Sequence, residues 1–202
     1  MCGRYTAWMI ARTNWRGYAV EEHQIPEAAP LPTYNAAPGQ MLPVIDARGW
    51  REAKWGITAS FSPRPMVNAT AEKLTGRFWA SLMQHRCLVP ANGYFEWDAV
   101  KQPWYFMHRD LPVICFAGLM DGGSFAVITI PSNDDAAPVH DRMPAIIEPE
   151  SASAWLDPAI GAGAAASLIF APPAGTLQRY PVSRAVGSVK NNGPELIAPL
   201  AA

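Results

Sequence analysis

The sequence has little charge and no marked excess of either sign. Of its 202 residues, 16 are Lys or Arg and 17 are Asp or Glu, so the formal net charge is −1. Charged residues make up 16% of the chain, below the roughly 25% of typical soluble domains, while half of the residues are apolar. A disordered chain is therefore excluded. A protein that attracts nucleic acid through a chain-wide positive field is excluded as well.

Cysteine is scarce, and long hydrophobic runs are missing. The cysteines Cys2, Cys87 and Cys115 lack zinc-ligand spacing, and an odd count without a signal-peptide pattern indicates a reducing, cytoplasmic compartment. No run approaches the ~18 apolar residues that a membrane span needs, so no membrane partner is expected. Cys87 and Cys115 lie in apolar runs and are predicted to be small core residues.

Proline and arginine are the residue types in excess. The 20 prolines are about twice the usual share of about 5%, which favours strands, turns and long connections over a helix bundle. Twelve of the 16 cations are arginine, and the first 120 residues carry twelve Lys or Arg against nine Asp or Glu. Arginine suits bidentate phosphate contacts and stacking on bases, which indicates an anion site in this part of the chain. Scattered solvated arginines are the alternative.

Short apolar runs bounded by Pro and Gly predict a strand-rich fold. A polar segment separates the first two runs, which predicts a β-hairpin. The predicted strands are Met41–Ile45, Glu52–Gly56, Cys87–Val89, Tyr94–Trp97, Trp104–Met107, Val113–Ala117, Phe125–Thr129 and Ala145–Ile147.

Helical patterns are few. Helices are predicted for about Gly76–Gln84 and Ser151–Trp155, with weaker patterns in Trp8–Asn14 and Gly161–Ala166. Strands outnumber helices and do not alternate with them regularly. The predicted fold class is therefore α+β, with a mainly antiparallel, barrel-like sheet and a few peripheral helices. Because no repeat, linker or composition shift marks a boundary, residues 1–202 are predicted to form one domain.

The chemistry begins at Cys2. Initiator Met is usually removed before a small residue, which would make Cys2 the amino terminus, with an amine and a thiol on adjacent carbons. An α-amine, with a reference pKa of about 7.7–8.0, is partly neutral at pH 7. A neutral amine attacks an aldehyde to form a Schiff base, and the thiol can then close a five-membered thiazolidine ring without any cofactor. Alternatively, the thiol is the nucleophile and the amine its base, as in N-terminal-nucleophile hydrolases.

Further blocks follow MCGRY at the start of the chain. They are YNAAPGQMLPVI at Tyr34–Ile45, KWGI at Lys54–Ile57, VNATAE at Val67–Glu72, RCLVPANGYFEW at Arg86–Trp97, FAGLM at Phe116–Met120, APVHDRMPAII at Ala137–Ile147, WL at Trp155–Leu156 and PVS at Pro181–Ser183. Together and in this order, the blocks resemble the SRAP family of SOS-response-associated peptidase-like, abasic-site processing proteins. The resemblance covers nearly the whole chain and implies the SRAP fold.

The resemblance implies a sensor of abasic sites in single-stranded DNA, which are in equilibrium with a ring-opened aldehyde. By this resemblance, Cys2 is the covalent nucleophile and Asn68 holds Cys2 or the sugar oxygens. Glu96 and His140 exchange protons during ring opening, imine formation and reversal, and Glu72 orients Asn68 or an arginine. Associated AP-lyase and autoproteolytic activities are implied as well. Taken alone, Glu96 and His140 also fit ordinary polar surface residues, and Asn68 fits a turn cap.

DNA contacts must be local, because the overall charge does not supply them. Arg4 and Arg142 resemble the family's phosphate-contacting arginines. Pro38, Trp55 and Trp97 offer flat surfaces for an unstacked base, a contact worth roughly 1–3 kcal/mol per base. For Trp55, core packing is the alternative. Binding to the DNA backbone predicts an affinity that falls as salt rises.

The chain departs from the family at Thr70, where a phosphate-binding Arg usually follows Asn-Ala. Threonine can donate one hydrogen bond to a phosphate but carries no charge. Arg64, Lys73 and Arg77 are the neighbouring cations that could compensate. The departure bears on the strength of DNA binding more than on the covalent chemistry.

Two other functions fit part of the pattern. Glutamine amidotransferases with an N-terminal Cys also begin with MCG, and Asn92–Gly93 is similar to their oxyanion-hole dipeptide. They continue with Ile where this chain has Arg4, and their chains usually carry a synthetase domain. The third function is a non-catalytic single-strand binder, or a peptidase acting only on its own N-terminal segment. We expect a monomer that cross-links to abasic sites through Cys2 without a cofactor or metal.

Overall fold

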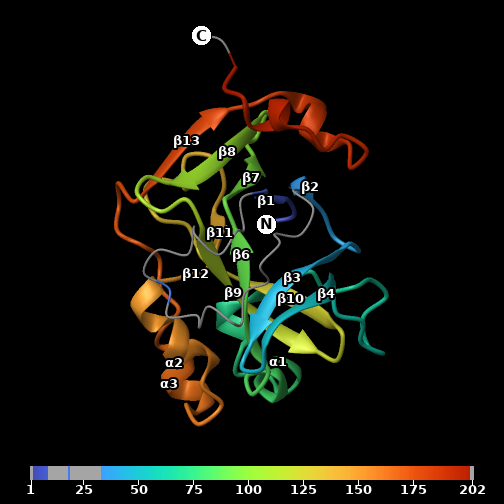
Figure 1. Cartoon of the computed structure of the whole chain (residues 1–202), viewed down its shortest axis with the longest axis vertical. Coiled ribbons are helices and arrows are strands. Elements are labelled where there is room, and N and C mark those ends of the chain that lie inside the picture. The colour runs from blue at the N-terminus through green and yellow to red at the C-terminus, as the bar shows by residue number, and fades with distance from the viewer. Residues whose placement is uncertain (1, 9–17, 19–32, 201–202) are drawn as a thin grey trace.

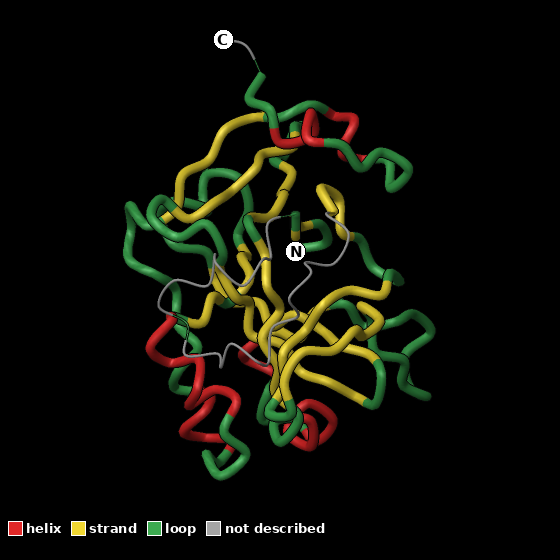
Figure 2. The backbone as a smooth tube through the Cα atoms, viewed as in Figure 1, coloured by secondary structure: helices red, strands yellow, loops and turns green. Residues whose placement is uncertain are grey.

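Two β-sheets make up most of the structure, a computed structural model that describes residues 2–8, 18 and 33–200 (Figures 1 and 2). The strands of the smaller sheet are β1 (Tyr5–Ala7), β2 (Thr33–Ala36), β7 (Gly93–Trp97), β8 (Pro103–His108) and β13 (Leu177–Pro181). They lie in the order β13-β8-β7-β1-β2, and each neighbouring pair is antiparallel. This sheet therefore places β1, which follows Cys2, directly beside β7, which carries Glu96.

The larger sheet bends until its strands nearly close a ring. Its strands are β3 (Met41–Asp46), β4 (Gly49–Trp55), β5 (Asn68–Thr70), β6 (Arg86–Ala91), β9 (Ile114–Asp121), β10 (Ser124–Pro131), β11 (Arg142–Pro144) and β12 (Ile146–Ile147). The path β10-β4-β3-β6-β9 returns to β10, because β9 and β10 also pair. The closure is partial, since β3 meets β6 only at Ile45 and Leu88. Most pairs are antiparallel, whereas β10 runs parallel to β4 and β5.

Apolar sequence on both faces of the central strands explains the ring. Seven of the eight residues of β9 are buried, and so are six of the eight residues of β10. Strands covered on both faces read as continuous apolar runs rather than as alternating ones. Gly118 lets β6 approach β9 closely, because a Cβ at this position would lie 2.7 Å from the sulfur of Cys87. The ring therefore encloses the main core of the protein.

Short helices cover one end of the larger sheet. They are α1 (Arg77–Leu82), α2 (Ala152–Leu156) and α3 (Ala162–Ala166), and the 3-10 turns are η3 (Ala71–Lys73), η4 (Pro149–Ser151), η5 (Arg184–Gly187) and η6 (Pro194–Ile197). Figure 1 shows the three α-helices at the end of the molecule opposite to β8 and β13. Trp79 of α1 and Trp155 of α2 are buried, and the Trp155 indole donates to the carbonyl of Cys87 at 2.8 Å. No helix among the described residues is long and apolar enough to cross a membrane.

Strand β10 links two polar regions of the protein. At its beginning, Ser124 follows the β9–β10 turn, and the Gly122 carbonyl of that turn accepts from Arg51, which lies near the β3–β4 turn. We name the region of these two turns the turn end. At its other end, Thr129 pairs with Thr70, and Pro131 pairs with Arg142. We name this region, together with Cys2, the Cys2 end. At ~3.3 Å per residue, the strand separates the two regions by about 20 Å.

The eight strands expected from the sequence are all present, and the α+β class with a mainly antiparallel sheet is confirmed. The predicted hairpin forms with a shorter turn, because Asp46 pairs with Gly49. Three predicted helices are present as α1, α2 and α3. The predicted helix Trp8–Asn14 lies outside the described residues except for Trp8. Five strands were not predicted from the sequence: β1, β2, β5, β11 and β13.

Candidate functional site

Cys2 lies just before β1 and is fully buried. The side-chain amide of Asn68, at the start of β5, donates a hydrogen bond to the Cys2 carbonyl oxygen at 3.0 Å. The Cys2 sulfur lies 4.0 Å from the carbonyl oxygen of Arg4, to which the thiol donates. The structure therefore brings Cys2 and Asn68 together, as the sequence predicts.

Glu96 reaches the same region from β7. Its side chain is buried, and burial raises the pKa of this carboxyl, although the positive charges of the amino terminus and of His140 act in the opposite direction. Burial also raises the pKa of the Cys2 thiol well above its usual range, and the negative charge of Glu96 adds to this effect. At neutral pH the thiol is therefore protonated. Glu96 and Cys2 therefore influence each other electrostatically.

His140 lies in the loop between β10 and β11, with about a quarter of its side chain exposed. Its Nδ1 accepts a hydrogen bond from the backbone N–H of Arg142 at 3.0 Å. Because a backbone N–H can only donate, the neutral ring carries its proton on Nε2. The Asp141 carboxylate, also 3.0 Å from Nδ1, is largely exposed and becomes an ion-pair partner only when the imidazole is protonated. His140 thus has a defined tautomer and acts electrostatically on Glu96.

Several polar atoms near Asn68 are buried without a hydrogen-bond partner among the described residues. They are Oδ1 of Asn68, Oγ1 of Thr70, Oγ1 of Thr129 and Nε of Arg142. The pairing of Thr70 with Thr129 on neighbouring strands brings two of these atoms together. Native proteins satisfy nearly all of their buried polar groups, so such a group of atoms is typical of a site that a ligand or water completes. The atoms offer both donors and acceptors to a sugar or a phosphate.

Arg142 is held in place before any ligand binds. Its guanidinium donates to both carboxylate oxygens of Glu72, at 2.6 and 2.9 Å, and to the carbonyl of Thr129 at 2.5 Å. The hydrogen bonds from Arg142 lower the pKa of Glu72. Glu72 was predicted to orient either an arginine or Asn68. The hydrogen bonds described here join it to an arginine, Arg142.

Arg4 binds the C-terminal part of the chain. Its guanidinium donates to Oδ1 of Asn35 at 2.9 Å and to the carbonyls of Val186 and Gly187 at 2.7 and 3.3 Å. Asn35 donates in turn to the carbonyls of Val186, Ser188 and Asn191. Arg4 and Asn35 together fix residues 186–191 beside β1 and β2. Sequence reasoning missed Asn35, although it lies in the block at Tyr34–Ile45.

The three flat residues proposed for base stacking differ in exposure. Trp55 is only 1% exposed, with its ring 5.1 Å from that of Tyr5 and 6.1 Å from that of Phe125. A stacking role for Trp55 is therefore wrong for this structure, because apolar neighbours cover the ring and its N–H donates to the carbonyl of Val67. Pro38 is exposed, and Trp97 is partly buried against a small second core.

An aromatic residue that the sequence did not single out lies in a cavity next to this site. Phe61 is 64% exposed and meets Phe78 edge-on at 5.0 Å. Both rings line a cavity of about 470 Å³ that also has Lys73, Arg77 and Glu72 in its wall. We name it the Phe61 groove. Of the cations expected to compensate for Thr70, Lys73 and Arg77 lie in this wall, whereas Arg64 is exposed but is not a lining residue.

The Asn92–Gly93 dipeptide has packing partners rather than the arrangement of an oxyanion hole. The Asn92 side chain accepts from the backbone N–H of Trp8 at 2.8 Å and donates to the carbonyl of Pro112 at 2.8 Å. A Cβ at Gly93 would lie 2.3 Å from the carbonyl oxygen of Phe106. Glycine is therefore needed here for close strand packing. Among the described residues, no group of three His, Cys, Asp or Glu side chains is arranged to hold a metal ion.

Comparison with proteins of known structure supports this description of the fold. A protein from Bacteroides thetaiotaomicron superimposes with a TM-score of 0.78 at 23% identity, over 98% of this chain and 100% of that one. A phage-related protein from Bordetella bronchiseptica superimposes with a TM-score of 0.75 at 26% identity, over 91% of this chain and 95% of that one.

Comparison with sequences identifies the family. The chain is 33% identical to the abasic site processing protein YedK of Escherichia coli, over 99% of this chain and 100% of YedK. It is 29% identical to the abasic site processing protein YoqW of Bacillus subtilis, over 98% and 99% of the two chains. The family model for SOS response associated peptidase matches residues 1–189. The chain therefore belongs to the SOS response associated peptidase (SRAP) family.

Proposed function

We propose that this chain recognises abasic sites in single-stranded DNA and cross-links to them through Cys2 after removal of Met1. The observation that carries the proposal is the environment of Cys2: Asn68 holds its carbonyl at 3.0 Å, and Glu96 and His140 act on the same region. The names of its relatives support abasic sites as the substrate. The buried polar atoms around Asn68 and Thr70 supply partners for the sugar and its phosphate.

The proposed reaction needs no oxidant, reductant or cofactor. The Cys2 amine attacks the aldehyde carbon of the ring-opened sugar to give a carbinolamine. Loss of one water, with a proton supplied to the departing hydroxyl, gives an imine. The Cys2 sulfur then bonds to the imine carbon while the thiol proton passes to the nitrogen, which closes the thiazolidine ring. The aldehyde and the aminothiol thus yield one thiazolidine and one water.

Glu96 and His140 provide the proton transfers of this sequence. A carboxyl whose pKa is raised by burial is present in both protonation states closer to neutral pH than an exposed carboxyl is. Protonated Glu96 donates to the hydroxyl that leaves as water, and the carboxylate accepts a proton from the attacking amine. His140 adds a second group, since its neutral ring offers one donor and one acceptor nitrogen for proton transfer. Reversal of the cross-link uses the same groups in the opposite direction.

The protonated thiol favours capture of an aldehyde over the glutamine amidotransferase alternative. A thioester mechanism begins with attack by a thiolate, and thiolate formation at Cys2 is opposed by burial and by Glu96. In the imine route the amine attacks first, and the thiol adds only after an electrophilic imine is adjacent. The packed positions of Asn92 and Gly93 also favour the imine route.

AP-lyase activity follows from the same imine when ring closure fails. An imine acidifies the neighbouring C2 carbon of the sugar, so a base can remove a C2 proton and expel the 3′ phosphate. His140 and Glu96 are the candidate bases. The thiol of Cys2 suppresses this elimination by consuming the imine. We therefore propose that strand cleavage is a side reaction whose rate rises when the thiol is removed.

The Phe61 groove gives the DNA strand a path away from Cys2. Glu72 lines the groove and also binds Arg142, which connects the groove to the Cys2 end. Exposed Phe61 can stack on an unpaired base, and Lys73 and Arg77 can bind the adjacent phosphates. Pro38 and Trp97 are further candidate contacts. Lys73 and Arg77 thus provide positive charge in the part of the chain that follows Thr70, a residue that has no charge of its own.

A denaturing gel tests the proposal. The processed protein is incubated with a single-stranded oligonucleotide that carries one abasic site, and a band of reduced mobility is the expected product. Cys2→Ala should lose the durable adduct. Cys2→Ser should retain an amine that borohydride traps as a reduced imine, with increased strand cleavage. Absence of an adduct with the wild-type protein, or an undiminished adduct in Cys2→Ala, would overturn the mechanism.

A blocked amino terminus separates the amine from the thiol. A version with an uncleaved residue before Cys2 has an amide nitrogen in place of the amine but keeps the thiol. We expect it to lose the cross-link while it retains non-covalent DNA binding, measured by fluorescence anisotropy. An ammonia assay with glutamine serves as the test of the alternative, and steady ammonia release would favour the amidotransferase.

A further inference from the structure

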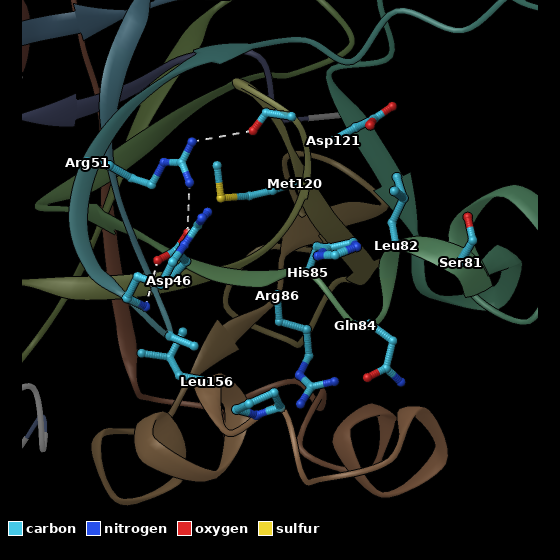
Figure 3. Close-up of a pocket in the computed structure, with 14 residues that line it drawn as sticks. Asp46, Arg51, Ser81, Leu82, Gln84, His85, Arg86, Met120, Asp121 and Leu156 are labelled. Atoms are coloured by element: carbon cyan, nitrogen blue, oxygen red, sulfur yellow. Dashed lines mark hydrogen bonds and ion pairs between the residues drawn. The ribbon is translucent and has the colours of Figure 1, made fainter.

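A second polar cavity lies at the turn end of the larger sheet, about 20 Å along β10 from the Cys2 end. Its volume is about 620 Å³, within the range of small-molecule sites. Four separate segments form its wall: the β3–β4 turn, the end of α1, the β9–β10 turn and the end of α2 (Figure 3). The reaction proposed at Cys2 uses none of these residues.

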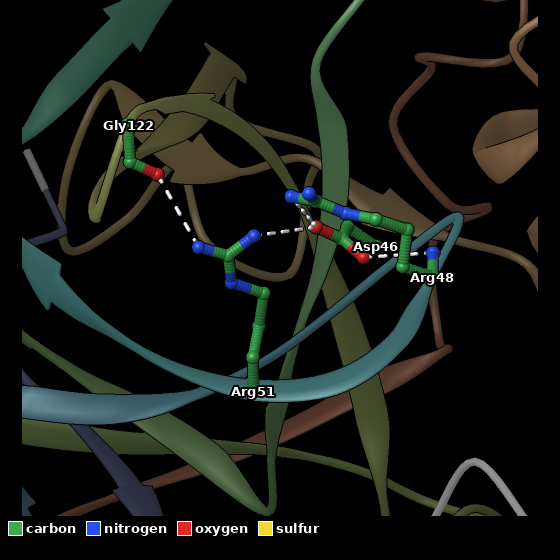
Figure 4. A network of polar contacts seen from close by, with 4 residues as sticks. All are labelled: Asp46, Arg48, Arg51 and Gly122. Atoms are coloured by element: carbon green, nitrogen blue, oxygen red, sulfur yellow. Dashed lines mark hydrogen bonds and ion pairs between the residues drawn. The ribbon is translucent and has the colours of Figure 1, made fainter.

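Asp46 holds two arginines on one side of this cavity. Its carboxylate accepts from Arg48 at 3.2 Å and from Arg51 at 3.1 Å, and also from the backbone N–H of Arg48 at 2.8 Å (Figure 4). Arg51 reaches across to the carbonyl of Gly122 at 3.5 Å and so links the two turns. The side chain of Asp46 is only 11% exposed, whereas that of Arg48 is 79% exposed. One buried acid thus orients two cations, and one of them faces solvent.

The charge of the cavity wall favours an anion. Three guanidinium groups, those of Arg48, Arg51 and Arg86, lie in the wall against the two carboxylates of Asp46 and Asp121. Arg86 is nearly buried, and its guanidinium donates to the backbone carbonyls of Met83, Trp155, Asp157 and Ile160. Those carbonyls are neutral acceptors, so these bonds leave the positive charge of Arg86 in the wall. His85 lines the cavity as well and adds positive charge whenever it is protonated.

Apolar side chains cover the rest of the wall. Leu82 and Leu156 come from α1 and α2, Met120 comes from β9, and Pro158 follows α2. In Figure 3, Leu82 lies on the side of the cavity opposite to Arg51 and Asp46. Met120 and Leu156 lie on the Arg51 and Asp46 side in Figure 3, so a ligand that fills this space must offer an anionic group to the arginines and a flat or apolar body that extends to Leu82.

We propose that this cavity binds a nucleoside monophosphate, with the phosphate at Arg48 and Arg51 and the base against Leu82, Leu156 and Met120. Arginine binds phosphate bidentately, and the pair held by Asp46 presents its donors without first having to be ordered. A guanidinium has five N–H groups, so the bonds to Asp46 and Gly122 leave donors on Arg51 for the ligand. The ligand is either a free nucleotide or the phosphorylated terminal nucleotide of a strand.

Calorimetry with the full-length protein tests this site. The probes are dAMP, deoxyadenosine, inorganic phosphate and a short 5′-phosphorylated oligonucleotide that has no abasic site. We expect dAMP to bind at least tenfold more tightly than deoxyadenosine and than inorganic phosphate, because only dAMP fills both parts of the cavity. Added salt should weaken dAMP binding. Oligonucleotide binding that needs the 5′-phosphate and is weakened by Arg48→Ala would assign the site to a strand terminus, whereas dAMP binding that needs Arg48 without such an effect on the oligonucleotide would assign it to a free nucleotide.

Arg48→Ala is the decisive variant, since a largely exposed side chain can be removed with little effect on folding. We expect its dAMP affinity to fall about tenfold, while Arg109→Ala, at an exposed arginine that lines neither this cavity nor the Phe61 groove, leaves the affinity unchanged. Ser81→Trp should block the cavity from its exposed rim. Equal binding of dAMP and deoxyadenosine, no binding at millimolar dAMP, or wild-type affinity in Arg48→Ala would overturn the proposal. Cross-linking at Cys2 is a separate readout, so failure of either proposal is recognised independently.

Discussion

The two ends of the larger sheet differ in how their polar atoms are satisfied. At the Cys2 end, Oδ1 of Asn68 and the hydroxyls of Thr70 and Thr129 are buried without a partner among the described residues. At the turn end, the nearly buried carboxylate of Asp46 is fully engaged by Arg48 and Arg51. The polar atoms of the Cys2 end are thus available to a ligand, whereas the carboxylate of the turn end already has its partners and lies beside a cavity.

This difference indicates two ways of retaining a ligand. An unsatisfied buried polar group costs about 1–3 kcal/mol, so a ligand that satisfies several of them gains stability from a few contacts. A covalent bond at Cys2 then prolongs the complex without requiring much positive charge. Among the described residues of the turn end, none has a buried polar side-chain atom left unsatisfied, so a ligand there must be attracted by charge. Binding there should therefore depend more strongly on salt than retention of DNA at Cys2 does.

The largest effect is expected from Asn68. Asn68→Ala removes the donor that holds the Cys2 carbonyl and removes one of the unsatisfied acceptors. Loss of this positioning should slow cross-linking about 100-fold, as is typical when reacting groups are misplaced by about 1 Å. The rate is measured from gel bands over time at saturating protein. Asn68→Asp keeps the acceptor and should be slowed as well if the donor is what matters.

Gln84→Ala serves as the control from the turn end, where the exposed Gln84 lines the cavity. It should cross-link at the wild-type rate. If Asn68→Ala cross-links as fast as Gln84→Ala does, the proposed contrast between the two ends has no functional meaning.

The next effect concerns the buried carboxyl of Glu96. Burial raises its pKa above the ordinary value of 4.5, so the folded protein binds a proton that the unfolded chain releases. The contribution of Glu96 to the free energy of unfolding is fully present below pH 4.5, and it is lost as the pH rises through the raised pKa of the folded state. Glu96→Gln cannot titrate and should gain stability relative to wild type over this pH window, although its cross-linking should be slow.

Thermal melts of wild type and Glu96→Gln across pH 4 to 8 measure this difference. We expect the difference in melting temperature to grow with pH and then to level off. A difference that is constant with pH would show that Glu96 has the same pKa in the folded and unfolded states.

The sequence predicted most of the strands because their apolar residues are contiguous. The central strands β9 and β10 read directly as buried runs. Strands β1, β5 and β11 have only three residues each, which is too short for an apolar period to be recognised. They form because neighbouring strands supply the hydrogen bonds. These short strands carry or adjoin Cys2, Asn68, Thr70 and Arg142, so the site depends on the elements that were hardest to predict.

Roles that depend on the exposure of a side chain or on its contact partners could not be predicted from the sequence either. Trp55 lies in a block shared with the family, but its strand turns the ring into the core against Tyr5 and Phe125. Arg4 was expected to contact phosphate, whereas its guanidinium binds Asn35 and the carbonyl of Val186, 182 positions further along the chain. Contacts between residues so far apart in sequence have no local pattern. The residues of the site could therefore be named from the sequence, but their partners could not.

A comparison of the two ion pairs sharpens the contrast between the ends. Asp46 is 11% exposed and holds two arginines, whereas Glu72 is 55% exposed and holds one. Asp46→Asn should lower the free energy of unfolding by about 2 kcal/mol, the range for hydrogen bonds to charged groups. Glu72→Gln should lower it by about 0.2–1 kcal/mol, as is usual for exposed pairs.

Urea denaturation of both variants tests this order. Glu72→Gln should nevertheless change non-covalent DNA binding more than Asp46→Asn does, because only Glu72 holds Arg142. If Glu72→Gln is the less stable variant, exposure does not govern the strength of the two pairs.

The smallest effect is expected at Thr70, where the sequence resemblance leads us to expect an arginine. Thr70→Arg adds one positive charge next to the unsatisfied hydroxyl of Thr129 and should tighten non-covalent binding of single-stranded DNA a few-fold at moderate salt. One additional phosphate contact should also steepen the dependence of log K on log salt by about 0.7. Thr70→Met, similar in length but uncharged, controls for packing and should leave the slope unchanged. If Thr70→Arg leaves the slope of log K against log salt unchanged, Lys73 and Arg77 already neutralise the nearest phosphate. DNA binding at the Cys2 end would then not require a positive charge at position 70.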